Sequence, residues 1–87
     1  MYKFETTDNF EREFRRLDKS NGRMILKYIK KNIMPLENPK DRGKALVADK
    51  KGLWRYRIGD YRLICKIEDD KLLILALSVG HRRDIYK

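Results

Sequence analysis

The stretch from Trp54 to Lys66, WRYRIGDYRLICK, decides the fold. Apolar and charged residues alternate on both sides of Gly59-Asp60, and such alternation is typical of a β-strand with one buried face. Gly-Asp suits the two-residue turn of a β-hairpin. The sequence therefore predicts two antiparallel strands, and closing the turn at this dipeptide places Arg57 directly opposite Arg62.

This register divides the hairpin into two faces. The apolar face can pack on the rest of the protein and carries Trp54, Tyr56, Ile58, Tyr61, Leu63, Cys65 and Ile67. The other face is basic and carries Arg55, Arg57, Arg62 and Lys66. Two like charges in direct cross-strand contact are destabilising by about 0.2–1 kcal/mol, and a bound phosphate would reverse that sign. The basic face is therefore either a phosphate-binding surface or an ordinary solvated one.

The segments around the hairpin complete an α+β fold. Residues 71–79, KLLILALSV, are apolar on both faces from 72 to 77, which indicates an interior strand with a second neighbour, namely residues 1–6. Two helices precede the hairpin, one capped by Asp8 and one capped by Ser20 or Asn21, and Pro35 ends the second. Residues 35–53 form a long connection with a short helical turn around 43–47, and this connection is either functional or simply a solvated charge run.

We therefore expect one domain over residues 1–87, with the order β-α-α-β-β-β. Its sheet is four-stranded and mostly antiparallel, and both helices cover one face.

Composition narrows the class of protein. The 22 lysines and arginines against 13 aspartates and glutamates give a net charge of +9, which favours a polyanionic partner over a merely basic soluble protein. A single cysteine, Cys65, excludes an intramolecular disulfide and a thiolate metal cluster, and on the apolar face it should be a buried, inert thiol. The polar start and the lack of a long apolar run predict a cytoplasmic protein with no membrane association. We expect no metal and no cofactor.

The tail supplies a second group of polar residues. His81, Arg82, Arg83 and Tyr86 follow the glycine that ends the last strand, and we expect them near the basic face. Imidazole is the side chain best suited to give and take a proton near neutral pH, so His81 is a candidate acid or base.

The segments GKAL and GLWRYRIGDYRLICKIEDDKLLILALSVGHRRDIYK resemble the RelE/ParE superfamily of toxins from bacterial type II toxin–antitoxin systems. WRYRIGDYRLI and VGHRRDIY are most similar to the RelE branch. The resemblance implies an endoribonuclease that cuts messenger RNA in the ribosomal A site through the adjacent 2′-hydroxyl, without a metal. It also implies as partners the 70S ribosome, messenger RNA and a cognate acidic antitoxin, RelB-like or similar, with DNA reached only through the antitoxin.

By the same resemblance, the catalytic residues are Arg55, Arg57, Arg62, His81, Arg82 and Tyr86. We expect further contacts with RNA or the ribosome from Lys44, Lys50, Lys51, Lys66 and Arg83. An arginine stays charged below about pH 12 and is a poor base, so we assign proton transfer to His81 and charge stabilisation to the arginines. Alternatively, ribosomal RNA and substrate geometry carry the rate with no side-chain base. Two rival functions remain, a ParE-like DNA gyrase inhibitor that is not an enzyme and a non-catalytic module that binds RNA or the ribosome.

Overall fold

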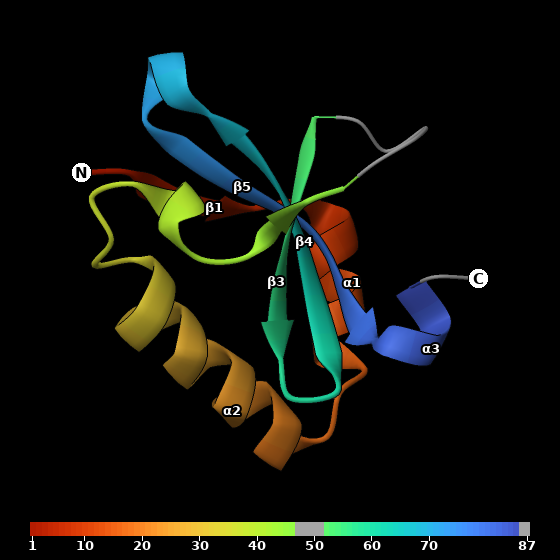
Figure 1. The fold of residues 1–87 in the computed structure, drawn as a ribbon. Helices are drawn as coiled ribbons and strands as arrows, with labels where there is room; N and C mark the ends of the chain where they lie inside the picture. The colour runs from red at the N-terminus through yellow and green to blue at the C-terminus, as the bar shows by residue number, and fades with distance from the viewer. Residues whose placement is uncertain (47–51, 86–87) are drawn as a thin grey trace.

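The computed structural model describes residues 1–46 and 52–85, which form a mixed sheet with two helices on one side and a short helix beyond the end of the last strand (Figure 1). Its strands are β1 (Lys3–Thr6), β2 (Lys44–Ala45), β3 (Leu53–Ile58), β4 (Tyr61–Glu68) and β5 (Leu73–His81). Its helices are α1 (Asp8–Arg15), α2 (Lys19–Tyr28) and α3 (Arg82–Ile85). A π-helical turn (Ile29–Ile33) extends α2, and 3₁₀ turns lie at Pro39–Asp41 and Asp69–Lys71. The strand order is β1-β5-β4-β3-β2.

The hairpin of β3 and β4 has the predicted register. Ile58 pairs with Tyr61, Arg57 with Arg62, Tyr56 with Leu63, and Trp54 with Cys65. The prediction of an interior last strand is also confirmed, because β5 lies between β4 and β1. β1 pairs with β5 in parallel, whereas the other three pairs of strands are antiparallel.

The sheet has five strands, so the expectation of four is wrong in this detail. The extra strand is β2, which replaces the helical turn predicted around residues 43–47. Lys44 and Ala45 extend along β3, where they pair with Arg55 and Trp54. The unpaired edge of β3 offers hydrogen-bonding groups to the passing chain, and this tertiary pairing outweighs the weak local preference for a helix.

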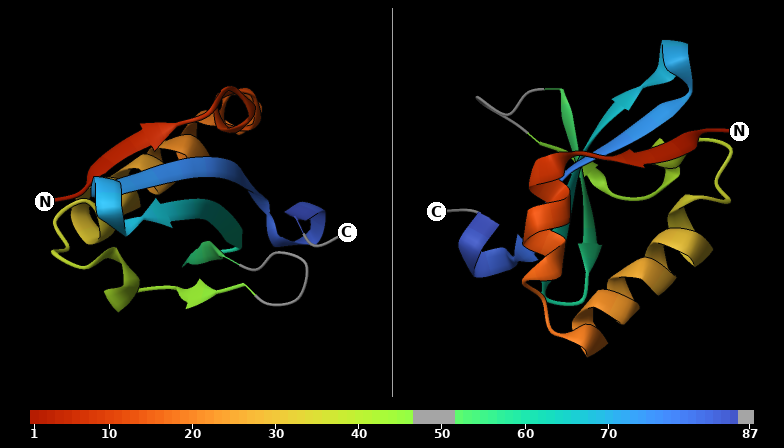
Figure 2. Two further views of the ribbon diagram at one scale, coloured as in Figure 1. Left: turned by 90° about the horizontal axis from the view of Figure 1, so that it is seen from above. Right: turned by 180° about the vertical axis from the view of Figure 1, so that it is seen from behind.

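Helices α1 and α2 lie on the same side of the sheet, as predicted for the two helices that precede the hairpin (Figure 2). The predicted caps are wrong by one to three residues: Thr7 caps α1 by accepting a hydrogen bond from the N–H of Phe10, and Asp18 caps α2 by accepting one from the N–H of Asn21.

The core between the helices and the sheet consists of Phe10, Ile25, Ile29, Ile33, Tyr56, Ile58, Leu63, Cys65, Ile74, Ala76 and Val79. No helix in the described ranges is long and apolar enough to cross a membrane.

A β-bulge interrupts the pairing of β4 with β5. Ile64 pairs with Ser78 and Cys65 pairs with Ala76, which leaves Leu77 without a partner in the ladder. The carbonyl of Leu77 instead accepts hydrogen bonds from the Asn9 side-chain amide (2.9 Å) and the Thr7 hydroxyl (3.3 Å). An extra residue inverts the alternation beyond it, so the residues of β5 after Leu77 face opposite sides from those that an uninterrupted strand would give them.

Thr7 links the start of α1 to the sheet, and we expect its replacement to lower the stability of the protein. Its hydroxyl caps the helix and also donates to the carbonyl of Ala76 at 3.1 Å. Thr7→Ala is expected to lower the free energy of unfolding by about 1 kcal/mol, the usual cost of losing such a cap. Urea titration would measure this change. The exposed neighbour Thr6 makes no cap, and Thr6→Ala should change stability by less than about 0.5 kcal/mol. Equal losses in the two variants would contradict the assignment of the cap.

Candidate functional site

A row of arginines lies on the face of the sheet opposite the helices. Arg55 and Arg57 project from β3, and Arg62 projects from β4 directly across from Arg57. Arg57 is exposed, Arg55 is half-buried, and Arg62 is only 4% exposed. Lys66 lies on the same strand and face as Arg62 but is exposed, and its ammonium lies 3.6 Å from the carboxylate of Glu68. The arginines thus form a cationic surface whose deepest member is Arg62.

The guanidinium of Arg62 is buried with one donor unused. Its Nη1 donates to the carbonyl of Tyr61 at 3.1 Å, whereas its buried Nε has no hydrogen-bond partner among the described residues. On one side its cross-strand partner is Arg57, and on the other it is Gly80, which has no side chain. A buried charged donor without a partner is costly, and an anionic oxygen is the acceptor that satisfies it best. Arg62 is therefore placed to bind an anion such as phosphate.

His81 lies on the helix side of the sheet, so the expectation that it is near the basic face is wrong. It pairs with Tyr61 in the ladder, and the two rings pack edge to face with their centres 5.6 Å apart. Its Nδ1 accepts a hydrogen bond from the N–H of Arg83 at 3.3 Å, which leaves the proton of the neutral ring on Nε2. The physical reason for this placement is the bulge at Leu77, which turns His81 away from the arginines.

The other tail and loop residues have different positions. The N–H of Arg82 donates to the carbonyl of Asp60 at 2.9 Å, which fastens the start of α3 to the hairpin turn. The side chains of Arg82, Arg83 and Lys44 are exposed. Three predicted site residues, namely Lys50, Lys51 and Tyr86, lie outside the described residues.

A basic hollow lies at the outer edge of β3, which we call the edge notch. It has a volume of about 310 Å³ and is lined by Tyr28, Arg42, Gly43, Lys44, Arg55 and Arg57. Sequence reasoning missed Tyr28 and Arg42. Arg42 belongs to the charged run PKDRGK, which could have drawn attention to it, whereas Tyr28 has the spacing of a core residue of its helix.

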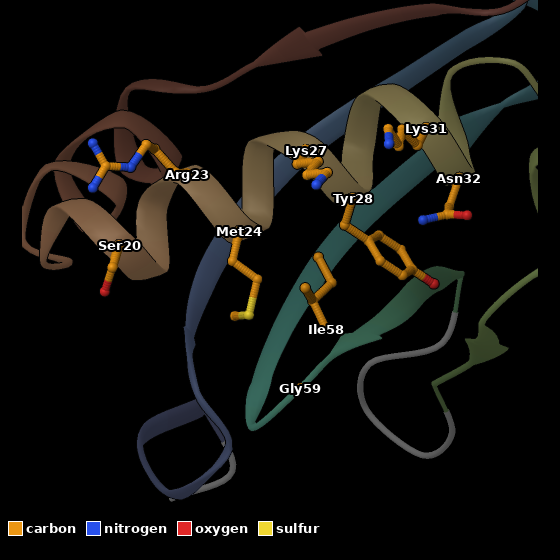
Figure 3. A pocket seen from close by; sticks show the side chains of 9 residues that line it. All are labelled: Ser20, Arg23, Met24, Lys27, Tyr28, Lys31, Asn32, Ile58 and Gly59. Carbon is orange, nitrogen blue, oxygen red and sulfur yellow. The ribbon is translucent and has the colours of Figure 1, made fainter.

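A larger groove runs between α2 and the tip of the hairpin (Figure 3). The side chain of Met24 projects from α2 toward the turn at Gly59, and the ring of Tyr28 projects from α2 beside Ile58. Its volume is about 560 Å³, and its lining residues are Ser20, Arg23, Met24, Lys27, Tyr28, Lys31, Asn32, Ile58 and Gly59. The groove thus has an apolar floor, and three cations are its only charged lining residues among those that the structure describes.

Cys65 is fully buried, as predicted. Burial raises the pKa of its thiol well above the ordinary range, so that the thiol is protonated and unreactive. In residues 1–46 and 52–85, no group of three or more His, Cys, Asp and Glu residues is placed to hold a metal ion.

Comparison with known proteins finds relatives described as toxins or as parts of toxin–antitoxin complexes. The family described as ParE toxin of the type II toxin–antitoxin system parDE matches residues 4–86. Toxin RelG of Mycobacterium tuberculosis is 40% identical over 45 residues, so the match covers about half of each chain, 52% in both cases. The toxin–antitoxin complex RelBE2 of M. tuberculosis contains a chain of the same fold, with a TM-score of 0.84 and 25% identity over 95% of this chain and 93% of that one. The isolated RelE toxin of E. coli shares the fold, with a TM-score of 0.71 and 18% identity over 99% and 92% of the two chains.

Proposed function

Because this chain belongs to the ParE toxin family of type II toxin–antitoxin systems, we propose that it is a toxin that cuts messenger RNA on the 70S ribosome. The observation that carries this proposal is the buried guanidinium of Arg62, whose Nε has no partner among the described residues and which has Arg57 beside it. Such a pair matches the oxygens of a phosphodiester better than it suits a purely structural role.

The proposed reaction is an internal transesterification. The 2′-oxygen attacks the adjacent phosphorus, and the bond from phosphorus to the 5′-oxygen breaks. The products are a 2′,3′-cyclic phosphate and a 5′-hydroxyl, so one proton leaves the 2′-hydroxyl and one proton reaches the departing oxygen. The guanidinium groups of Arg57 and Arg62 stabilise the negative charge that develops on the phosphate oxygens. Arg55 and Arg82 supply further positive charge, and Tyr86 is proposed to position the base.

Proton transfer requires a different account from the one that the sequence suggested. His81 lies on the opposite face of the sheet from Arg62, and arginine does not give up its proton at neutral pH. We therefore assign the two proton transfers to ribosomal RNA and solvent around the oriented substrate.

His81→Ala is consequently expected to cut at close to the wild-type rate, with an unchanged pH–rate profile. A general acid or base would contribute about 10²–10⁴-fold, so the two possibilities are well separated. The measurement is single-turnover cleavage across a pH series. A flattened profile near neutrality in the folded variant would restore His81 to the catalytic site.

The test of the main proposal uses purified wild-type protein and programmed ribosomes, with primer extension to locate cuts in the message. Gyrase supercoiling is measured in parallel, because the match to the ParE family supports a gyrase inhibitor as the second candidate. Cut message with active gyrase supports the nuclease. Inhibited gyrase with intact message overturns it in favour of the gyrase inhibitor. Ribosome binding with intact message and active gyrase also overturns it and leaves a non-catalytic binding module.

We further propose that an acidic antitoxin occupies the groove between α2 and the hairpin tip. Its apolar side chains would contact Met24 and Ile58, and its carboxylates would meet Arg23, Lys27 and Lys31. The net charge of +9 supports an acidic partner. The similar chain in RelBE2 comes from a toxin–antitoxin complex, which supports a partner of this kind.

Association with this antitoxin is expected to be fast and salt-sensitive, because complementary charge raises the rate of encounter. Lys27→Ala and Lys31→Ala should slow association, and Lys3→Ala on the distant edge strand β1 should not. Stopped-flow measurements over a salt series would test this expectation. An association rate that is independent of salt would contradict it.

A further inference from the structure

We propose that the edge notch binds a nucleotide that flanks the cleaved phosphate, with its phosphate held by Arg42 and Lys44 and its base against Tyr28. This inference rests on the proposed RNA substrate and adds a second contact site to it. The ligand class is a single-stranded RNA nucleotide, recognised by its phosphate and its ring and not by its sequence.

The position of the notch makes it continuous with the arginine face. Arg57 belongs to both the arginine face and the notch. It pairs with Arg62 of β4, and its side chain also lines the notch at the outer edge of β3. Among the described residues, β2 pairs only with Trp54 and Arg55, so it does not extend along the edge of β3 beside Arg57. Because adjacent strands lie about 4.8 Å apart, the notch is about 10 Å from the backbone of Arg62, within reach of a neighbouring nucleotide.

The backbone that carries Arg42 and Lys44 is held in place against β3. The indole N–H of Trp54 donates to the carbonyl of Arg42 at 2.7 Å, and Lys44 is paired with Arg55 in the sheet. Gly43 between them has φ +82°, and a Cβ there would collide with the carbonyl oxygen of Arg55. The segment thus lies against β3 with no space for a side chain between them. Because this backbone is fixed before binding, the notch loses less conformational entropy when the ligand arrives.

The composition of the notch favours RNA over an acidic peptide. Its described lining consists of four cationic side chains, one glycine and one half-buried aromatic ring, without a carboxylate. Guanidinium groups bind phosphate oxygens in pairs, and every base offers a flat surface to a tyrosine ring. An acidic peptide would use the charges but not the ring. Tyr28 therefore distinguishes the two ligands.

The experiment measures binding of a fluorescein-labelled RNA hexanucleotide that carries 2′-O-methyl groups and so cannot be cut. Arg42→Ala and Lys44→Ala are each expected to weaken binding about tenfold, the usual effect of losing a charged hydrogen bond. Each should also reduce the slope of log K against log salt by about 0.7. Arg15→Ala on α1 and Lys3→Ala on β1 remove the same charges far from the notch and should leave the affinity and the slope close to those of the wild type.

The ring is tested with a second pair of variants. Tyr28→Leu should weaken binding of the hexanucleotide about tenfold through loss of stacking, whereas Tyr28→Phe should retain it. Unfolding curves establish that each variant is folded. Equal weakening by the notch variants and their controls would overturn the proposal, and so would equal binding by the Leu and Phe variants. Displacement of the RNA by an equal concentration of a hexaglutamate peptide would assign the notch to an acidic protein segment and overturn it as well.

Cleavage on ribosomes is measured separately, so that the two proposals can fail independently. If the wild type leaves message intact and the binding pattern holds, the notch is supported and the nuclease assignment falls. If the wild type cuts message and the notch variants bind the hexanucleotide as the wild type does, the notch falls and the nuclease assignment is kept.

Discussion

Replacing Arg62 with alanine is expected to slow single-turnover cleavage of ribosome-bound message by about 10²–10³-fold, the usual cost of removing one donor that faces developing charge. Arg62 is the least exposed of the arginines and lies in a strand paired on both sides. Its guanidinium is therefore fixed before the phosphate arrives, and no binding free energy is spent on moving the side chain into place.

The fold should survive this substitution. The variant loses a buried charge with an unused donor and the repulsion between Arg57 and Arg62, and both losses favour the folded state. The lost packing of the aliphatic stem acts in the opposite direction. We expect the free energy of unfolding to stay within about 1 kcal/mol of the wild-type value.

Lys66→Ala compares a peripheral predicted RNA contact with the buried Arg62. Lys66 lies four residues along the same strand on the same face, but it is exposed and close to Glu68. Its removal should change the cleavage rate far less. Arg62→Lys keeps the charge without the planar fork, and it should recover only part of the rate. Cleavage by folded Arg62→Ala at the wild-type rate would show that the buried guanidinium does not meet the phosphate.

The hairpin could be predicted from the sequence because its alternation and turn agree. A slip of one residue would turn one strand over relative to the other and place either Arg62 or both Arg55 and Arg57 in the core, so only one register is compatible with burial of the apolar face. The interior position of β5 was predictable for a similar reason, since a strand that is apolar on both faces needs neighbours that cover it.

The bulge at Leu77 could not be predicted, and it decides where His81 lies. Its carbonyl is satisfied by Asn9 and Thr7, which come from the start of a helix nearly seventy residues earlier in the chain. Neither glycine nor proline marks the position in the segment LALSV. The expectation that His81 lies near the basic face was therefore wrong, although its neighbour in the ladder, Tyr61, was assigned to the correct face.

The edge notch was beyond prediction because its parts come from distant segments. Tyr28 belongs to α2, Arg42 and Lys44 belong to the connection and β2, and the remaining arginines belong to β3. Only the pairing of β2 with β3 brings them together. The sequence showed a charged connection, and the structure shows which of its charges face the same hollow.

The buried thiol of Cys65 makes stability depend on alkaline pH. Burial raises the pKa of this group in the folded protein, whereas in the unfolded chain it titrates at about 8.5. Below that value the thiol is protonated in both states and does not affect the equilibrium. Above it only the unfolded chain loses the proton, so unfolding becomes more favourable by about 1.4 kcal/mol for each pH unit. Burial also raises the pKa of Tyr56, but the unfolded tyrosine ionises only from about pH 10, so its contribution begins later.

Between about pH 8 and pH 10, the wild type is expected to lose about 2 kcal/mol more of its free energy of unfolding than Cys65→Ala. Urea titrations of both proteins at several pH values would measure the difference, and titrations shared by the two, including that of Tyr56, cancel in it. The alanine variant should start less stable, because it leaves a small cavity between β4 and the helices, and the two curves should then converge as pH rises. Parallel curves would mean that the thiol ionises as readily in the folded protein as in the unfolded chain, which contradicts its position in the core.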